Sequence, residues 1–150
     1  MVVKRSVPID ESPSVNESAA KGAPRIDPSK IIKITDTRYQ GQKCGTSLLQ
    51  QTSGRGKTTL VLTVSKSVST EWKSEAKIDA KVVSAGVGFS VTKSYTVENQ
   101  TRYEVPKGKF GTVQAYPLYD LYTFNVKILN AKKPGWAMKP VGVCFNQWTE

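Results

Sequence analysis

The 150-residue chain contains no histidine and only two cysteines. Without histidine, Ser-His-Asp and Cys-His catalysis is excluded, and so are histidine-based zinc and iron sites. The two cysteines are too far apart to form a CxxC pair. A phosphate-binding loop is missing as well, because Gln51 stands where its first glycine would have to be. We therefore expect no enzymatic activity, no metal and no cofactor.

Long apolar runs are also missing, and no stretch reaches the roughly 20 apolar residues of a membrane-spanning helix. The first five residues, Met1 to Arg5, lack the apolar centre of a secretory leader. If the protein is exported, we expect that its leader has been removed. The hydrophobic fraction of 38% is low, but it suffices for the thin two-layer core of one domain.

Acidic residues are outnumbered, and the net charge is +10. Residues 1–30 carry five basic and four acidic side chains, so nearly all of the excess belongs to the rest of the chain. This charge favours an anionic membrane or cell-surface component as partner, although it also fits a role in solubility alone. Lysine and arginine are spread over turns and strand ends rather than gathered on one aromatic face. Nucleic acid is therefore not expected as a partner.

Cys44 and Cys144 bracket most of the chain, and this placement predicts a disulfide between them. Such a bond would close a loop of about 100 residues, worth roughly 4–5 kcal/mol in the chain-entropy model. Its persistence would require an oxidising compartment, so we expect a secreted protein. Two buried free thiols are the alternative.

Residues 1–30 show no hydrophobic periodicity and contain four prolines, Pro8, Pro13, Pro24 and Pro28. This composition predicts a flexible arm or pro-segment. Residues 31–150 are expected to form a single β domain, with order beginning near Ile31.

From Ile31 onward the dominant hydrophobic period is two, which is typical of strands. The predicted strands are 31–35, 47–52, 58–69, 116–128 and 141–145. The predicted turns are 53–57, 106–109 and 132–135, with Gly54 and Gly56 supplying positive φ angles in the first. Pro117 indicates an edge or a bulge at the start of its strand.

The longest alternation runs from Val83 to Val105, with apolar residues on one side and mainly Ser, Thr and Gly on the other. As one straight strand it would reach roughly 75 Å, so a bend is expected at Gly86 and Gly88. Residues 71–83 fit either a strand or a helix, and strand is slightly favoured. The predicted fold is an all-β, elongated antiparallel β-sandwich with long Ser/Thr-rich strands and, as an alternative, a short helix near 71–83.

Aromatic residues near the C-terminal half are candidates for surface binding, because Tyr and Trp suit boundaries between apolar and wet surroundings. The alternative, which we favour, is that they fill the sandwich core with the tyrosine hydroxyls at its rim. The candidates are Tyr116, Tyr119, Trp136 and Trp148.

Residues 58–69 followed by 87–97, and the strand end at 105–109, resemble the stem region of aerolysin-type β-pore-forming toxins, the group of epsilon-toxin and mosquitocidal toxins. The resemblance covers roughly residues 58–128. These toxins usually carry a separate receptor-binding domain, and here residues 1–57 and 129–150 lie outside the resemblance. The segments 115–119 and 139–146 also resemble small exported proteins of Gram-positive bacteria.

The toxin resemblance implies a secreted, membrane-active protein, pore-forming or antimicrobial, that forms a homo-oligomer and extends a hairpin into the membrane. Apolar side chains would face lipid, and Ser and Thr would face the lumen. The membrane-facing candidates are Ala76, Ile78, Ala80, Val82, Val87, Phe89 and Val91. The alternative function is a secreted binding module or inhibitor that recognises an anionic cell-surface polymer, a glycan or a protein.

Overall fold

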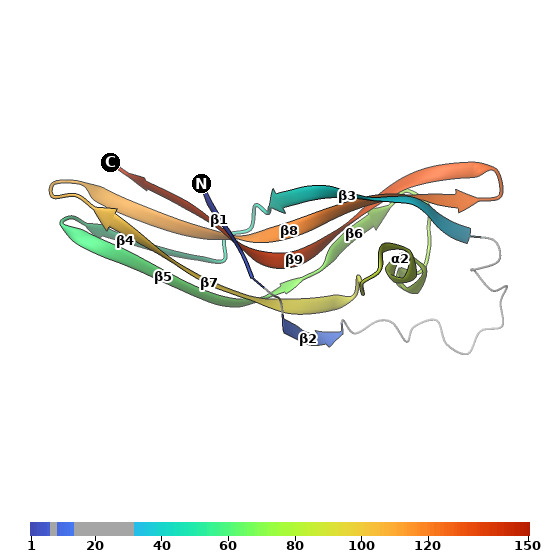
Figure 1. Ribbon diagram of the computed structural model, residues 1–150, viewed down its shortest axis with the longest axis horizontal. Helices are drawn as coiled ribbons and strands as arrows, with labels where there is room; N and C mark the ends of the chain where they lie inside the picture. Colours follow the sequence, from blue (N-terminus) through green and yellow to red (C-terminus); the bar gives the residue numbers. More distant parts are fainter. Residues whose placement is uncertain (7–8, 14–31) are drawn as a thin grey trace.

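The computed structural model describes residues 1–6, 9–13 and 32–150. Figure 1 shows two antiparallel layers that share one long axis, with a single helix labelled at one end. The elements are β1 (Val2–Arg5), β2 (Ile9–Pro13), β3 (Ile32–Cys44), β4 (Gln50–Arg55), β5 (Thr58–Ser69), β6 (Glu71–Ser74), α2 (Ala80–Val87), β7 (Lys93–Val105), β8 (Phe110–Ile128) and β9 (Ala131–Thr149). The predicted all-β, elongated antiparallel sandwich is thus confirmed.

The larger sheet, here sheet A, is built around the β8–β9 hairpin, whose strands are 19 residues long. β3 and β4 follow one another along the outer edge of β8. β6 and β1 share the outer edge of β9 in the same way. Because four short strands line two long ones, the hairpin is the only element that runs the length of the described part of this sheet.

The smaller sheet, sheet B, has the order β2-β7-β5. β5 and β7 form twelve consecutive pairs, from Thr58–Val105 to Ser69–Ser94, without a bulge. Period-two alternation explains the burial, because every second β5 residue from Leu60 to Val64 is buried and its neighbours are exposed.

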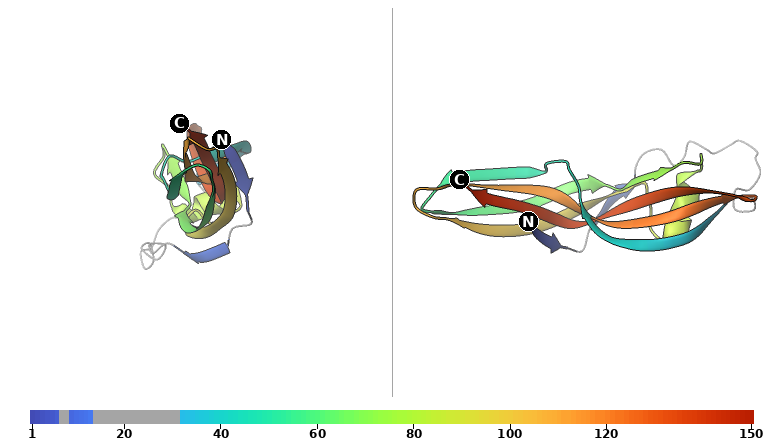
Figure 2. Two further views of the ribbon diagram at one scale, coloured as in Figure 1. Left: turned by 90° about the vertical axis from the view of Figure 1, so that its left-hand side faces the viewer. Right: turned by 90° about the horizontal axis from the view of Figure 1, so that it is seen from above.

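The chain passes between the sheets at one end of the molecule, from β4 to β5 and from β7 to β8 (Figures 1 and 2). Turns near 53–57 and 106–109 were predicted, and the second is confirmed with Gly108 at a φ of +84°. The predicted turn at 53–57 is shorter in the structure, because β4 continues to Arg55. The connection from β4 to β5 then passes from sheet A to sheet B and does not close a hairpin within one sheet. Gly56 has no positive φ; a Cβ there would lie 1.8 Å from the Pro106 carbonyl oxygen.

Two apolar clusters fill the interior of the sandwich. The first lies between the two sheets and includes Leu62, Val97 and Phe145. The second lies beyond the end of sheet B, where α2 covers the far part of sheet A (Figure 1). Its buried members are Val83, Val91, Phe124, Val126 and Ala137.

The predicted continuous strand from Val83 to Val105 is wrong for residues 83–92, because α2 occupies residues 80–87 and β7 begins only at Lys93. For residues 71–83 strand was slightly favoured over helix, and this holds only for β6. The Asp79 carboxylate accepts a hydrogen bond from the Lys81 backbone N–H and caps α2. Gly88, with a φ of +90°, ends the helix. These two capping signals outweigh the period-two pattern, because the apolar side chains also fit one helical face against sheet A.

The predicted turn at 132–135 is also wrong, since β8 and β9 join through Leu129 and Asn130 and residues 132–135 belong to β9. Pro117 is not at the start of its strand, because β8 begins at Phe110. It does lie beside a bulge, as the register shifts between Leu118 and Tyr119. Pro117 also sits where β3 gives way to β4 along that edge.

The described parts of the N-terminal segment form two short strands. β1 pairs with β9, and β2 pairs with the start of β7. Arg5 donates two hydrogen bonds to the Asp120 carboxylate, at 2.6 and 2.7 Å. The arm prediction is therefore corrected for residues 2–5 and 9–13, whereas residues 7, 8 and 14–30 lie outside the described residues.

Candidate functional site

The membrane-facing candidates lie in the segment between β6 and β7, residues 75–92, which we call the linking segment. Val91 is buried, and the other candidates are half-buried. All except Val82 belong to the second apolar cluster. The structure therefore brings them together on the inner face of sheet A, against Phe124 and Ala137.

Polar contacts and one cation hold the linking segment in place. The Ser84 hydroxyl accepts a hydrogen bond from the Val91 N–H at 2.9 Å, which ties α2 to the chain that follows it. Lys139 of β9 places its ammonium 5.8 Å from the Phe89 ring centre, a cation–π distance. At Gly86 the helix approaches β3 so closely that a Cβ would lie 2.4 Å from the Ile34 Cβ.

The segment is anchored at the end of the β5–β7 pairing. The Thr70 N–H donates to the Lys93 carbonyl at 3.1 Å, so the ladder continues one step beyond Ser69. The Thr70 hydroxyl is buried without a hydrogen-bond partner among the described residues. An unsatisfied buried hydroxyl is costly, so this junction between sheets is a weak point of the compact fold.

Beyond Thr70 the chain leaves sheet B, and β6 pairs with β9 in sheet A. Glu71, at the start of β6, lies beside the Tyr119 hydroxyl. Burial, together with the Glu71 carboxylate, raises the pKa of Tyr119 above its ordinary value. Tyr119 is therefore a neutral hydrogen-bonding group at this position.

The outer face of sheet B carries small hydroxyl side chains along β5. Ser65 donates to the Glu98 carboxylate at 3.1 Å, and the Ser69 and Ser94 hydroxyls lie 3.3 Å apart. The exposed hydroxyl residues of β5 are Thr59, Thr63, Ser65, Ser67 and Ser69. On β5 this face carries no charged residue, and its one apolar member is the exposed Val61.

The four surface-binding candidates do not gather into one site. Tyr119 is 5% exposed and belongs to the core, so it is wrong as a surface candidate. Tyr116 packs beside the disulfide, and its hydroxyl donates to Gln114 Oε1 at 2.8 Å. Trp148 lies near the end of β9 opposite Thr112, half-buried.

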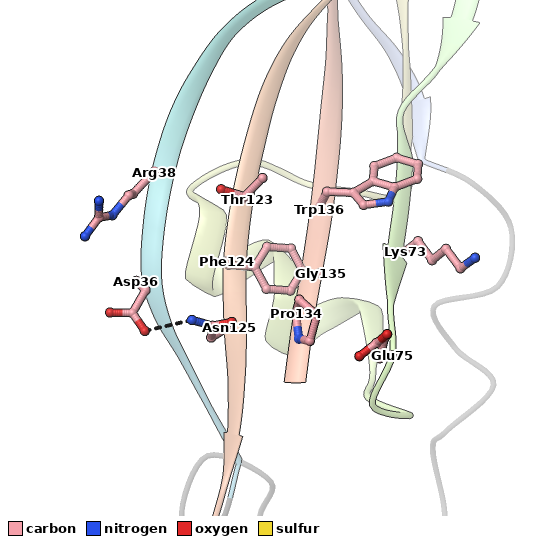
Figure 3. A pocket seen from close by; sticks show the side chains of 10 residues that line it. All are labelled: Asp36, Arg38, Lys73, Glu75, Thr123, Phe124, Asn125, Pro134, Gly135 and Trp136. Atoms are coloured by element: carbon pink, nitrogen blue, oxygen red, sulfur yellow. Dashed lines mark hydrogen bonds between the residues drawn. The ribbon is translucent and has the colours of Figure 1, made fainter. Parts of the chain in front are cut away.

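Trp136 alone lines a hollow, of about 580 Å³, which we call the Trp136 hollow. Figure 3 shows β3 on one side, β8 and β9 in the middle and β6 on the other side. The lining residues are Asp36, Arg38, Lys73, Glu75, Thr123, Phe124, Asn125, Pro134, Gly135 and Trp136. Sequence patterns did not reveal this group, because its members come from four strands that only the sheet register brings side by side.

The predicted disulfide is present, with Cys44 and Cys144 Cα atoms 6.0 Å apart. It joins the end of β3 to β9 across β8, and both half-cystines pack with Leu118 and Val141. No helix among the described residues is long and apolar enough to cross a membrane.

No protein-family model matches the chain, and no curated protein matches it either.

Proposed function

We propose that this is a secreted, cationic protein without catalytic activity that permeabilises anionic membranes by extending the β5–β7 hairpin through residues 70–93. The observation that carries the proposal is the register of sheet B. Twelve pairs run without a shift up to Ser69–Ser94, and β6 followed by the linking segment joins the two strands at that end. Continuing the same register needs only that β6 and the linking segment leave sheet A.

The continued register sorts the side chains by polarity. Ala76 would lie opposite Val87, Ile78 opposite Ala85, and Ala80 opposite Val83. One face of the extension would then be apolar except for Ser74 and, at its base, Thr70 and Lys93. The apolar residues are Trp72, Ala76, Ile78, Ala80, Val83, Ala85, Val87, Phe89 and Val91.

The opposite face of the extension would be polar on both legs. One leg would present charges of alternating sign, and the other small residues. The charged residues are Glu71, Lys73, Glu75, Lys77 and Asp79; the small ones are Ser84, Gly86, Gly88, Ser90 and Thr92. This face continues the hydroxyl-rich outer face of sheet B, because strand side chains alternate.

The length of the extension also supports the proposal. Each leg has about eleven residues before a reversal at Lys81 and Val82, and a membrane-crossing strand needs about 9–11. Val82 would lie in that reversal, not on the lipid-facing side of a leg.

Association of copies is part of the proposal. Within the described residues, β5 has no strand partner on its outer edge. An unpaired strand edge is a template for pairing with another chain. The net charge of +10 would attract the protein to anionic lipid.

A reversible cross-link between β6 and β9 tests the proposal. Glu71 and Met138 are directly paired, and such antiparallel neighbours have Cα separations that a disulfide can bridge. We expect the E71C/M138C protein to fold normally and to release no dye from phosphatidylserine-containing vesicles. Reductant should restore release, because β6 can then leave sheet A.

The controls are the two single cysteine variants and the wild-type protein treated with the same reductant, because the native disulfide is reduced as well. After vesicle exposure, a cross-linking size ladder should show oligomers only for unstapled protein. Dye release by the oxidised double variant at the wild-type rate would refute hairpin extension. A wild-type protein that permeabilises no vesicle would refute membrane activity altogether.

The second candidate function is a secreted binding module, and the Trp136 hollow favours it. A half-buried aromatic residue among polar side chains that four strands bring together is typical of a small-ligand surface. This candidate does not need the linking segment to move.

A further inference from the structure

The Trp136 hollow lies on the face of sheet A opposite to α2. Phe124 and Ala137 point to the α2 side, where they join the second apolar cluster. Thr123 and Trp136 are their neighbours along β8 and β9, and alternation directs those side chains to the other face. Thr123 and Trp136 are also paired across the hairpin. The hollow and the linking segment therefore lie on opposite faces of sheet A, and Phe124 is the residue that contributes to both.

The middle of the hollow combines an aromatic surface with hydrogen-bonding groups. In Figure 3 the Trp136 indole leans toward β6, and Glu75 lies beside Pro134. Within the described part of the chain, the Trp136 and Glu75 side chains make no hydrogen bond. An indole N–H and a carboxylate are thus available to a ligand.

One carboxylate of the hollow is already fixed in position. Asn125 donates to Asp36 Oδ2 at 3.0 Å, and the Lys132 ammonium lies 3.3 Å from the same oxygen. These contacts, with the Asn125 bond as the main cause, lower the pKa of Asp36. Asp36 also has a φ of 57°, and the register of β3 shifts between Thr35 and Arg38. This bulge places an ordered acceptor at one wall.

The charges of the hollow argue against an anionic ligand. Asp36 and Glu75 balance Arg38 and Lys73, although the whole protein is strongly cationic. In Figure 3 the Arg38 and Lys73 side chains extend away from the middle of the hollow. An anion would therefore meet carboxylates before it met the cations, whereas hydroxyl groups can donate to those same carboxylates.

We propose that the Trp136 hollow binds a neutral saccharide, with one sugar ring stacked on the indole and its hydroxyls donating to Glu75. A sugar ring has an apolar C–H face and polar edges, and it matches an aromatic surface bordered by acceptors. The volume of about 580 Å³ lies within the usual range of small-ligand sites.

The position of the hollow gives the ligand a regulatory effect, which rests on the proposed function. Lys73 and Glu75 form one wall and belong to the chain that would leave sheet A when the hairpin extends. The complete hollow exists only while β6 is paired with β9. A ligand that binds only the compact form stabilises that form by mass action. Free saccharide should therefore slow permeabilisation.

The binding test uses the full-length protein and a panel of neutral methyl glycosides of galactose, glucose, mannose and N-acetylglucosamine. Calorimetric titration should detect at least one of them. W136A should weaken that affinity by about tenfold or more, as expected for loss of a central aromatic contact. W148A, which removes a half-buried Trp from the other end of β9, should leave it unchanged.

Glu75→Gln provides a second variant that preserves shape and lies at an exposed position. It should weaken glycoside binding several-fold, because a charge-assisted hydrogen bond becomes a neutral one. Circular dichroism should confirm that every variant is folded. The proposal is overturned if no neutral glycoside binds, if W136A binds as well as wild type, or if only glucuronate, phosphocholine or inorganic phosphate binds.

The coupling is measured separately by dye release from phosphatidylserine vesicles with and without the bound glycoside. Wild-type release should slow as the glycoside saturates the protein, and W136A release should not respond. Binding without any effect on release would overturn the coupling and leave the saccharide site standing. If wild-type protein releases no dye, the proposed function fails, and the titrations still decide the saccharide site.

Discussion

Substitution of Gly86 by alanine tests why a glycine lies within α2. Gly86 faces β3, and a Cβ on it would lie 2.4 Å from the Ile34 Cβ and 2.5 Å from Cγ2. Ile34 is part of the second apolar cluster, and its Cβ is fixed directly to the strand backbone. Rotation of the side chain therefore cannot relieve the contact, and α2 must move away from sheet A.

Two opposing effects determine how much G86A changes the free energy of unfolding. Alanine is favoured over glycine inside a helix by about 1 kcal/mol. Overpacking of a filled interior costs about 1–3 kcal/mol, and a contact this short belongs at the upper end. We therefore expect G86A to lower the free energy of unfolding by about 2 kcal/mol, in spite of its better helix propensity.

The measurement is urea unfolding followed by tryptophan fluorescence, for which Trp72 is a suitable reporter because it packs in the same cluster. Ala85→Gly is the matched control, since Ala85 is exposed on the helix and its replacement should cost only about 1 kcal/mol. A G86A protein as stable as wild type, or more stable, would refute the assigned contact between α2 and β3.

Three further predictions concern other parts of the fold. Arg5→Ala should destabilise the protein by about 2–3 kcal/mol, because the buried Asp120 loses its charged partner while Arg5 itself is half-exposed. Urea unfolding should show this loss of stability, and the control Lys107→Ala, in an exposed turn, should show none. Replacing both Cys44 and Cys144 by serine should cost about 4–5 kcal/mol in the chain-entropy model, and mass spectrometry of unreduced, alkylated protein should find no free thiol. The raised pKa of Tyr119 means that the folded state retains this proton after the unfolded state has lost it, so stability should fall as pH rises above the ordinary tyrosine value of about 10. Tyr119→Phe should show a smaller fall over the same pH range, and an identical pH profile for both proteins would contradict this assignment.

Local alternation was sufficient for the all-β class and the β5 strand, and the disulfide partners followed from the presence of only two cysteines. Leu60, Leu62 and Val64 alternate with exposed residues in the structure as they do in the sequence. Alternation failed from residue 80 to residue 92, because a short apolar stretch with small residues fits a helix as well as a strand. The helix is favoured by the caps at Asp79 and Gly88 and by packing against the end of sheet A that sheet B does not cover.

The length of β8 and β9 was underestimated for a related reason. Lys132 to Gly135 has the composition of a turn, yet pairing with β8 holds it in strand conformation. The N-terminal strand β1 was missed because it is four residues long and carries two charges. Its order depends on the edge of β9 and on Asp120, which are more than a hundred residues away in the sequence.

The sequence by itself determined which residues are apolar, which are charged and which alternate, and these properties were enough for the fold class and for the candidate membrane-facing residues. Only the tertiary structure decided that those residues pack beneath sheet A, that Tyr119 is buried, and that Trp136 shares a hollow with Asp36 and Glu75. The physical reason is strand register. A period of two identifies the face of a strand on which a side chain lies, but the partner across the sheet depends on long-range pairing that no local pattern contains.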